Sequence, residues 1–460
     1  MNRRQFLGSV GAAALAAPAM AHAQTERKPN IIWIMADDLG LYDVGCYGQK
    51  LIQTPCIDRI AAEGVKFTQA YAGSTVCAPS RSVLMQGLHS GHSTVRGNSA
   101  AVGGPPPQRR IPLNPDDVTV AEALKAAGYA TGIVGKWGLG EPGTEGIPNK
   151  QGFDHWFGYL NQRHAHTHYT DYLWRNTDKV ALEGNRDGKR TQYSHDLMTE
   201  EALGFVRRSK ARPFFLYLAY TLPHAKFHVP SLEPYADKPW PAEAKAYAAM
   251  VTRMDRDIGR LMALLKELGL DRDTIVFFTS DNGGYPDGTA RKMFHPQGPL
   301  RGQKGNLYEG GLRVPMLVRW PGRIAPGRVS DQVWAFWDFF PTACELAGAE
   351  PPKGLDGISM LPAILGETQR QGHEFLYWEF RTRNFSQAVR WGDWKGIRSG
   401  TEEPLALYNL KTDLGEKHNV AAAHPDVVKK IEGFMAASRT PSKHWPSLPK
   451  RRRRKPKRKK

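Results

Sequence analysis

Short, almost wholly apolar runs recur through the first two thirds of the chain, and each has the length of one buried β-strand. Between these runs, apolar residues recur every three or four positions, which is the spacing of amphipathic helices. The predicted strands are 29–36, 65–71, 129–134, 214–220, 274–279 and 314–319, and the predicted helices are 57–63, 120–127, 196–210, 242–268 and 337–347. Because helices alternate with strands that are apolar on both faces, we predict an α/β fold with a large mixed, mainly parallel sheet sandwiched by helices.

The pattern changes after residue 348. Residues 349–372 are rich in Pro and Gly, which indicates a linker. Beyond it, 374–380, 387–398 and 405–409 have the pattern of antiparallel strands, and 425–437 has that of a helix packed on them. We therefore predict a large domain at 29–348 and a smaller C-terminal α+β domain at 373–446.

Polar clusters directly follow four of the predicted strands of the large domain. They are Asp37-Asp38, Gly135-Lys136, Pro223-His224 and Asp281-Asn282. In open α/β sheets, ligands bind beyond the carboxyl ends of the strands, so we expect one site here rather than four unrelated surface turns. Adjacent carboxylates such as Asp37 and Asp38 repel each other unless a cation lies between them, and Ca²⁺ or Mg²⁺ accepts such oxygen ligands.

The stretch 76–87 contains the strongest chemical signal in the chain. Pro79 suits the first turn of a helix, where its missing N–H costs nothing, and this places Cys77 at the N-terminus of the helix. The helix dipole favours an anion at that end, and Arg81 lies four residues on, on the same helix face. The alternative is a buried structural cysteine, which would leave Pro79, Ser80 and Arg81 at these offsets unexplained.

The net charge of +18 is concentrated at the C-terminus. Residues 450–460 hold ten of the basic residues, so the rest of the chain carries +8, which suits an anionic substrate. We predict that 447–460 is a disordered basic tail, either solvated or in contact with anionic glycans or the cell envelope, and we expect no nucleic-acid partner. With Cys77 assigned to chemistry, three cysteines remain, an odd number that argues against a disulfide framework.

Residues 1–23 are predicted to be a signal peptide. Arg3 and Arg4 lie in a stretch that resembles the twin-arginine export signal, and a short Ala-rich apolar run and Ala21-His22-Ala23 follow it. The run is too short to span a bilayer, for which about 20 strongly apolar residues are needed, although an uncleaved anchor is the alternative. We therefore expect a periplasmic or secreted protein, exported by the twin-arginine route, with no transmembrane segment after removal of the signal.

The sequence Cys77-Ala78-Pro79-Ser80-Arg81, with Gly87 after it, resembles the signature of the type I, formylglycine-dependent sulfatases of the alkaline phosphatase-like superfamily. The resemblance covers the chain from residue 29 to about residue 434. It implies the fold predicted above and the hydrolysis of sulfate monoesters, either of sulfated carbohydrates, which an exported enzyme would meet, or of aryl sulfates. It also implies that a formylglycine-generating enzyme or an anaerobic maturase converts Cys77 to formylglycine (3-oxoalanine), whose hydrate is the nucleophile.

The resemblance also assigns roles to the polar clusters. It implies that the metal, which is Ca²⁺ in the family with Mg²⁺ as the alternative, binds Asp37, Asp38, Asp281, Asn282 and the modified Cys77. It implies that Arg81 and Lys136 hold the formylglycine, and that His224 and Lys304 contact the sulfate and its leaving oxygen. Further residues are expected to line the substrate site: His89, His92, Arg96, Asn98, His164 and His166.

The sequence departs from the family pattern at Gly138. The family motif Gly-Lys-Trp-His has a histidine at this position that helps to release sulfate. The imidazole-rich segment 162–169 supplies a substitute base, binds the substrate or is an ordinary polar loop, and the sequence leaves these three possibilities open.

Two other functions fit part of the pattern. A phosphate or phosphonate monoester hydrolase of the same fold would often use Thr or Ser, with two zinc ions and more histidine ligands, whereas no histidine is among the matched metal positions. A non-catalytic protein that binds sulfated glycans would fit Gly138 and the basic tail, but the presence of Cys77, Arg81 and Lys304 argues against it.

Overall fold

The computed structural model describes residues 27–447, apart from 101, 105–108, 285–287 and 382–384. The predicted signal peptide at 1–23 and the predicted tail beyond residue 447 lie outside the described residues. The described α-helices are α1 (Pro55–Ala62), α2 (Cys77–Gln86), α3 (Val120–Ala126), α4 (Ser194–Ser209), α5 (Ala242–Glu267), α6 (Gly288–Phe294), α7 (Glu309–Leu312), α8 (Phe339–Leu346), α9 (Leu361–Leu365) and α10 (Pro425–Ala437). The described strands are β1 (Asn30–Ala36), β2 (Val65–Phe67), β3 (Ala70–Tyr71), β4 (Ala130–Lys136), β5 (His155–Tyr159), β6 (Tyr172–Arg175), β7 (Asp178–Ala181), β8 (Phe214–Ala219), β9 (Thr274–Ser280), β10 (Met316–Arg319), β11 (Arg328–Ser330), β12 (Trp334–Ala335), β13 (Leu376–Arg381), β14 (Phe385–Trp391), β15 (Trp394–Ser399) and β16 (Ala406–Asn409).

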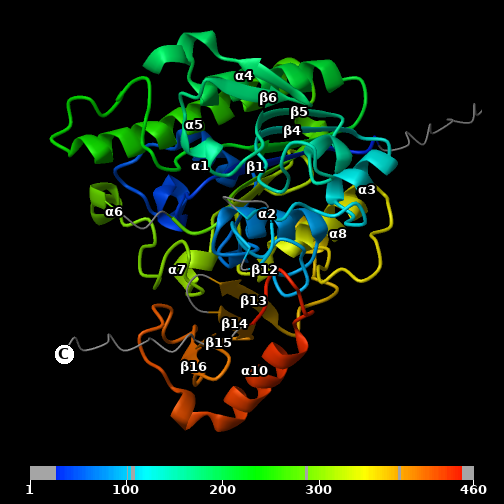
Figure 1. The fold of residues 1–460 in the computed structure, drawn as a ribbon, viewed down its shortest axis with the longest axis vertical. Coiled ribbons are helices and arrows are strands. Elements are labelled where there is room, and N and C mark those ends of the chain that lie inside the picture. Colours follow the sequence, from blue (N-terminus) through cyan, green and yellow to red (C-terminus); the bar gives the residue numbers. More distant parts are fainter. Residues whose placement is uncertain (1–26, 101, 105–108, 285–287, 382–384, 448–460) are drawn as a thin grey trace, which may run out of the picture.

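Ten strands form one large sheet, in the order β11-β2-β10-β9-β1-β8-β4-β5-β6-β7. Figure 1 labels β1, β4, β5 and β6 of this sheet. The central strands from β9 to β5 run parallel to one another, and antiparallel pairs flank them on both sides. β1 lies in the middle, with Ile31 opposite Phe215 of β8 and Ile275 of β9. The predicted large mixed, mainly parallel sheet is confirmed.

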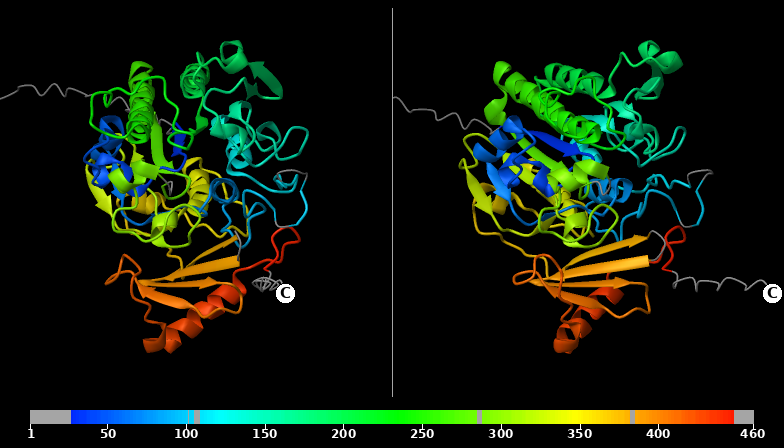
Figure 2. Two further views of the ribbon diagram at one scale, coloured as in Figure 1. Left: turned by 60° about the vertical axis from the view of Figure 1, so that its left-hand side comes forward. Right: turned by 90° about the vertical axis from the view of Figure 1, so that its left-hand side faces the viewer.

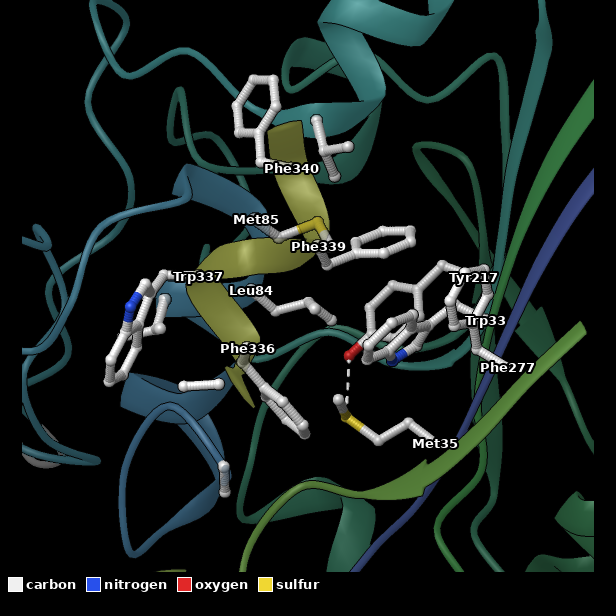
Figure 3. Packing of buried hydrophobic residues seen from close by; sticks show 14 of the residues in the cluster. Trp33, Met35, Leu84, Met85, Tyr217, Phe277, Phe336, Trp337, Phe339 and Phe340 are labelled. Atoms are coloured by element: carbon white, nitrogen blue, oxygen red, sulfur yellow. Dashed lines mark hydrogen bonds between the residues drawn. The ribbon is translucent and has the colours of Figure 1, made fainter. Parts of the chain in front are cut away.

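The two faces of β1 contact separate hydrophobic cores, because successive side chains of a strand point to opposite faces of the sheet. Trp33 and Met35 pack with residues of α2, α3 and α8, whereas Ile32 and Ile34 pack with residues of α1, α4 and α5. Figure 3 shows the first of these cores, in which the ring of Trp33 lies 4.2 Å from that of Phe339. Every residue of β1 is buried, and helices cover both faces of the sheet, as predicted (Figure 2).

The C-terminal region forms a four-stranded antiparallel sheet, β13-β14-β15-β16, with α10 packed on one face (Figure 2). Polar contacts join this sheet to the larger unit. The indole N–H of Trp378 donates to the backbone oxygen of Ala72 at 3.0 Å. The ammonium group of Lys395 donates to Glu309 at 2.7 Å, and both side chains are completely buried. Because a buried charge is costly without its partner, this ion pair fixes the small sheet against α7.

Three predicted elements differ from the observed ones. The strand predicted at 65–71 is two strands, β2 in the large sheet and β3 in a two-stranded sheet with β12, because the chain leaves the large sheet at Thr68. The strand predicted at 387–398 is the hairpin β14-β15, which turns at Gly392, where φ is 55°. The helix predicted at 337–347 begins as a 3-10 turn at Phe336–Asp338 before α8.

The hydrophobic pattern also missed several short elements. β5, β6 and β7 form one edge of the large sheet, and β11 forms the other. β6, β7 and β11 are only partly buried, so polar residues interrupt their apolar runs. The segment predicted as a linker, 349–372, contains the short helix α9.

Candidate active site

The four predicted polar clusters meet at one end of the large sheet. Asp37 and Asp38 follow β1, Lys136 ends β4, and His224 lies beyond β8. Asp281-Asn282 follows β9. These strands are neighbours in the order β9-β1-β8-β4 and run parallel, so their carboxyl ends lie side by side. All of these side chains are buried.

Cys77 is the first residue of α2, and its side chain lies against these clusters. Asn98 helps to hold this end of the helix, because its Oδ1 accepts a hydrogen bond from the backbone N–H of Ala78 at 2.9 Å. The Sγ of Cys77 lies 3.4 Å from Asp37 Oδ1 and 3.6 Å from Lys304 Nζ. Burial, together with the charge of Asp37, raises the pKa of the Cys77 thiol to about 12. The unmodified thiol is therefore protonated at neutral pH and is a poor nucleophile.

Arg81 is completely buried on α2 and joins two of the strand ends. Its guanidinium donates to Asp281 Oδ2 at 2.8 Å and to the backbone oxygen of Lys136 at 2.6 Å. Charge-assisted contacts in two directions fix the orientation of the guanidinium. Arg81 therefore positions α2, and Cys77 with it, relative to β4 and β9.

Each of the two adjacent carboxylates contacts a lysine. Lys136 Nζ donates to Asp37 Oδ2, and Lys304 Nζ donates to Asp38 Oδ2, both at 2.6 Å. Burial opposes ionisation of Asp37, but the charges of Lys136 and His224 hold its pKa well below the ordinary value. Burial and the charge of Asp37 raise the pKa of Asp281 to about 6. A divalent cation beside these carboxylates would favour the ionised form of Asp281 and so lower its pKa again.

The donor atoms at this end of the sheet fit a hard divalent cation. Donor atoms of Asp37, Asp38, Cys77 and His224 lie within 4.8 Å of one another. Asn282 Nδ2 donates to Asp38 Oδ1 at 2.8 Å, whereas Asn282 Oδ1 is buried and has no hydrogen-bond partner among the described residues. A buried carbonyl oxygen without a partner is costly, and a bound cation would satisfy it. Ca²⁺ and Mg²⁺ both prefer such carboxylate and amide oxygens.

Two histidines lie beside the lysine and carboxylate pairs. His224 Nε2 lies 3.4 Å from Asp38 Oδ2 and 3.3 Å from Lys304 Nζ. Burial lowers the pKa of His224 despite the nearby carboxylates. The ring of His166 lies 4.3 Å from that of His224, and burial and His224 lower the pKa of His166 to about 3. Both imidazoles are therefore neutral at pH 7 and able to accept a proton.

Gly138 follows β4 by two residues and has a φ of 84°. A Cβ atom built on Gly138 would lie 1.8 Å from the Nε2 of Gln162, so the side chain of Gln162 fills the space beside the backbone there. Gln162 is 3% exposed, and neither atom of its amide has a hydrogen-bond partner among the described residues. In the sequence analysis, Gln162 appeared only as the first residue of the imidazole-rich segment. No pattern in the sequence indicates that its side chain lies against Gly138.

The other residues predicted to line the substrate site have contacts outside the four clusters. His89 and His92 follow the end of α2, and both lie near Asp356, with Nδ1 to Oδ2 distances of 3.7 and 2.9 Å. The guanidinium of Arg96 donates to Glu379 at 3.2 Å, which links the large unit to the small sheet. His164 Nε2 contacts the hydroxyl of Thr170 at 2.5 Å. Their predicted contacts with the substrate stay predictions.

Comparison with known proteins decides the family. The family model for sulfatases matches residues 29–349, most of the chain and all of the site described above. The chain belongs to the sulfatase family. A second model, for the C-terminal region of N-sulphoglucosamine sulphohydrolase, matches residues 303–439, which include Lys304 and the small sheet. The resemblance carried by Cys77-Ala78-Pro79-Ser80-Arg81 is thereby confirmed.

Similar sulfatases have several substrates. The chain is 34% identical to steryl-sulfatase of Mus musculus, over 82% of this chain and 71% of that one. It is 35% identical to N-acetylgalactosamine-6-sulfatase of Canis lupus familiaris, over 76% of this chain and 69% of that one. The chain is also similar to the crystal structure of Ps i-CgsB, with 31% sequence identity and a TM-score of 0.78. The match covers 92% of this chain and 95% of that one. That protein has also been solved in complex with k-i-k-neocarrahexaose.

This sulfatase is a sulfuric ester hydrolase with the alkaline phosphatase-like fold. Among its described residues, no helix has both the length and the apolar character needed to cross a membrane.

Proposed function

We propose that this sulfatase hydrolyses sulfate esters of carbohydrates at the site around Cys77, with Cys77 converted to formylglycine and a calcium ion bound beside it. The observation that carries the proposal is the position of Cys77, whose Sγ contacts Asp37 Oδ1 at 3.4 Å and Lys304 Nζ at 3.6 Å. A group at this position has carboxylates for a cation on one side and an ammonium donor on the other.

Conversion of Cys77 accounts for a buried cysteine whose thiol is a poor nucleophile. With a pKa of about 12, the thiol offers almost no thiolate at neutral pH. The hydrated aldehyde of formylglycine supplies a hydroxyl nucleophile and a second hydroxyl, which allows sulfate to leave and the aldehyde to re-form. A formylglycine-generating enzyme or an anaerobic maturase is the partner that this step requires.

The oxygen atoms of Asp37, Asp38, Asp281 and Asn282 would hold the metal, and the unpartnered Oδ1 of Asn282 supports this assignment. When bound, Ca²⁺, or Mg²⁺ as the alternative, supplies positive charge that neutralises the sulfate group.

The side chains of the site can bind sulfate and move a proton. Lys136, Lys304 and Arg81 place three positive charges around Cys77, and a sulfate ester, itself an anion, requires such surroundings. Asp38 holds the pKa of Lys304 above its ordinary value in spite of burial, so the ammonium group stays charged and can donate a hydrogen bond to the leaving oxygen. His224 Nε2, 3.3 Å from Lys304 Nζ, is the second group in reach of that proton.

The substrate class rests on the relatives and on the predicted export of the enzyme. An N-acetylgalactosamine-6-sulfatase and a protein solved with k-i-k-neocarrahexaose are both similar to this chain, which supports a sulfated carbohydrate. The steryl-sulfatase of Mus musculus makes steryl sulfates the competing class. The stretch around Arg3 and Arg4 supports export by the twin-arginine route, so we place the enzyme in the periplasm or outside the cell, where it would meet polysaccharides.

A substrate panel tests the proposal. Enzyme co-produced with a maturase is assayed on carrageenan and chondroitin 6-sulfate oligosaccharides, a steryl sulfate, an aryl sulfate and an aryl phosphate. The expected result is sulfate release with the highest kcat/KM on one of the oligosaccharides. A preference for steryl sulfate would overturn the substrate class, and a preference for aryl phosphate would indicate a phosphate ester hydrolase.

A further inference from the structure

A hollow of about 330 Å³ lies at one edge of the large sheet, lined by residues that follow β5 and by residues of β6. Its walls carry aromatic, cationic, amide and carboxylate side chains: Glu141, Asn161, Arg163, His164, Tyr172 and Trp174. Pockets that bind small organic ligands combine apolar surface with a few converging polar groups in this way. None of these lining residues belongs to the group around Cys77.

One short turn connects the hollow to the site. His164, Ala165 and His166 form a single 3-10 turn after β5. The ring of His166 lies 4.3 Å from that of His224 in the site, whereas the ring of His164 lies 4.3 Å from that of Tyr172 in the hollow. Because a 3-10 helix rises only about 2 Å per residue, the two histidines lie close together and the two spaces adjoin.

A second connection between the hollow and the site runs through the backbone. The backbone N–H of Gly138 donates to the oxygen of Leu160, which also lines the hollow, at 3.1 Å. Gly138 lies two residues after Lys136, whose ammonium group contacts Asp37. On the wall of the hollow, Glu141 pairs with Arg110 at 3.2 Å.

The surface chemistry of the hollow matches a sugar ring. The indole of Trp174 offers apolar area for the C–H face of a pyranose, beside the ring of Tyr172, which is stacked on His164. The amide of Asn161 donates to Glu141 Oε1 at 2.7 Å, and the carboxylate of Glu141 can also accept from a sugar hydroxyl. The charge of Glu141 is offset by Arg110, while Arg163 is exposed and Lys179 lies 4.8 Å from the centre of the Tyr172 ring. Asp171, the neighbour of Tyr172 in the chain, is an exposed carboxylate that offsets one of these two cations. One positive charge remains, which favours an anionic sugar.

We propose that this hollow is a second sugar subsite, which binds a ring of a sulfated oligosaccharide next to the ring whose sulfate ester lies at Cys77. The inference rests on the proposed function and narrows it, because it makes an oligosaccharide, rather than a sulfated monosaccharide, the preferred substrate. Trp174 and Arg163 are the residues that carry the extra affinity.

The test is calorimetric binding to an unmodified, inactive Cys77→Ser protein. The probes are k-i-k-neocarrahexaose and a chondroitin 6-sulfate hexasaccharide, each compared with the corresponding sulfated monosaccharide. We expect at least one hexasaccharide to bind roughly 10-fold more tightly than its monosaccharide, or about 1.4 kcal/mol. Adding Trp174→Ala should remove most of that difference, and Trp320→Ala, which removes an indole near β10 on the far side of the sheet, should not.

Arg163→Ala is the second variant, because Arg163 is exposed on a loop and its truncation does not threaten folding. It should weaken hexasaccharide binding more at low salt than at high salt. Equal affinity for hexasaccharide and monosaccharide, no hexasaccharide binding at all, or unchanged binding in both variants with intact folding would each overturn the subsite. These measurements need no turnover, so they are decided separately from the substrate panel that tests the proposed function.

Discussion

The side chain of Gln162 occupies the space into which any side chain at Gly138 would project. Its Nε2 lies 1.8 Å from the position of a Cβ atom at Gly138, far inside van der Waals contact. The two residues are therefore matched: the glycine leaves room for the glutamine, and the glutamine closes the gap that the glycine leaves. The place where the family motif has a histidine is thus filled here by an amide from another segment.

This relationship predicts the result of substitutions at Gly138. Gly138→Ala should lower the free energy of unfolding by more than Gly143→Ala, because Gly143 has a similar φ of 81° but open space around a Cβ atom. The backbone strain common to both is about 1 kcal/mol or more, and the clash adds to it at Gly138 only. Chemical denaturation of the two variants measures the difference.

The double variant Gly138→Ala, Gln162→Ala tests whether the clash with Gln162 causes the extra loss of stability. Truncation of Gln162 removes the clashing amide, so the double variant should recover to about the stability of Gly143→Ala, and the two changes should couple. Simple additivity of the two single losses would contradict the assigned contact.

A second prediction concerns the metal. Asp37→Ala and Asp281→Ala should each abolish turnover and calcium binding, because each removes a charged ligand from a buried group of oxygens. Asn282→Ala should weaken calcium binding without adding an unpaired charge, so its loss of affinity should be smaller. Elemental analysis and calcium titration of the purified proteins measure both effects.

Asp271→Asn serves as the control, because Asp271 pairs with Arg319 beyond the other end of β9. It should retain metal and turnover. Stoichiometric zinc in the wild-type protein, without calcium or magnesium, would contradict the assignment of the site to one hard cation.

A third prediction concerns the dependence of stability on pH. Burial raises the pKa of Asp43 to about 7, although Tyr247 and the backbone N–H of Gly40 donate to its Oδ2, and its Oδ1 has no partner among the described residues. The folded state therefore holds a proton that the unfolded chain releases near pH 4. This contribution is fully present below about pH 4 and is lost as the pH rises to about 7, with a slope of at most about 1.4 kcal/mol per pH unit.

Asp43→Asn isolates that contribution, since the amide is neutral at every pH and its oxygen can still accept from Tyr247. Between pH 4 and 7, the free energy of unfolding of the wild type should fall relative to that of Asp43→Asn. Parallel curves for the two proteins would show that Asp43 is ionised in the folded state.

The sequence predicts the centre of this molecule better than its edges. The buried parallel strands are continuous apolar runs, and the residues that directly follow them, from Asp37 to Asn282, could be placed at one site because parallel strands end together. β6 and β7 could not be predicted in this way, because one side of each strand is exposed and its apolar pattern is broken.

Contacts between distant segments also escaped prediction. The guanidinium of Arg96, which was predicted to line the substrate site, pairs with Glu379 of the small sheet, 283 residues away, and no local pattern indicates this pair. The contact of Gln162 with Gly138 could not be predicted from the sequence, because it depends on how β4 and β5 pair. Pairing of this kind follows from the folded sheet and not from local pattern.

The last prediction concerns the base that replaces the histidine missing at Gly138. His166 is the candidate, because its ring lies 4.3 Å from that of His224, which is itself 3.4 Å from Asp38 Oδ2. His166→Ala should lower kcat by about 10²- to 10⁴-fold, the range for loss of a general base. Release of the alcohol from an aryl sulfate should then show a burst before the steady state, whereas release of sulfate should not.

His164 provides the matched control, since it lies on the same 3-10 turn but faces the hollow and Tyr172. His164→Ala should raise KM for a sulfated oligosaccharide and leave kcat within a few-fold of the wild type. If His166→Ala changes only KM as well, His166 binds sugar, and the proton acceptor must be Lys136, a carboxylate of the metal site or water. The split between kcat and KM in these two neighbouring variants therefore separates the base from the subsite.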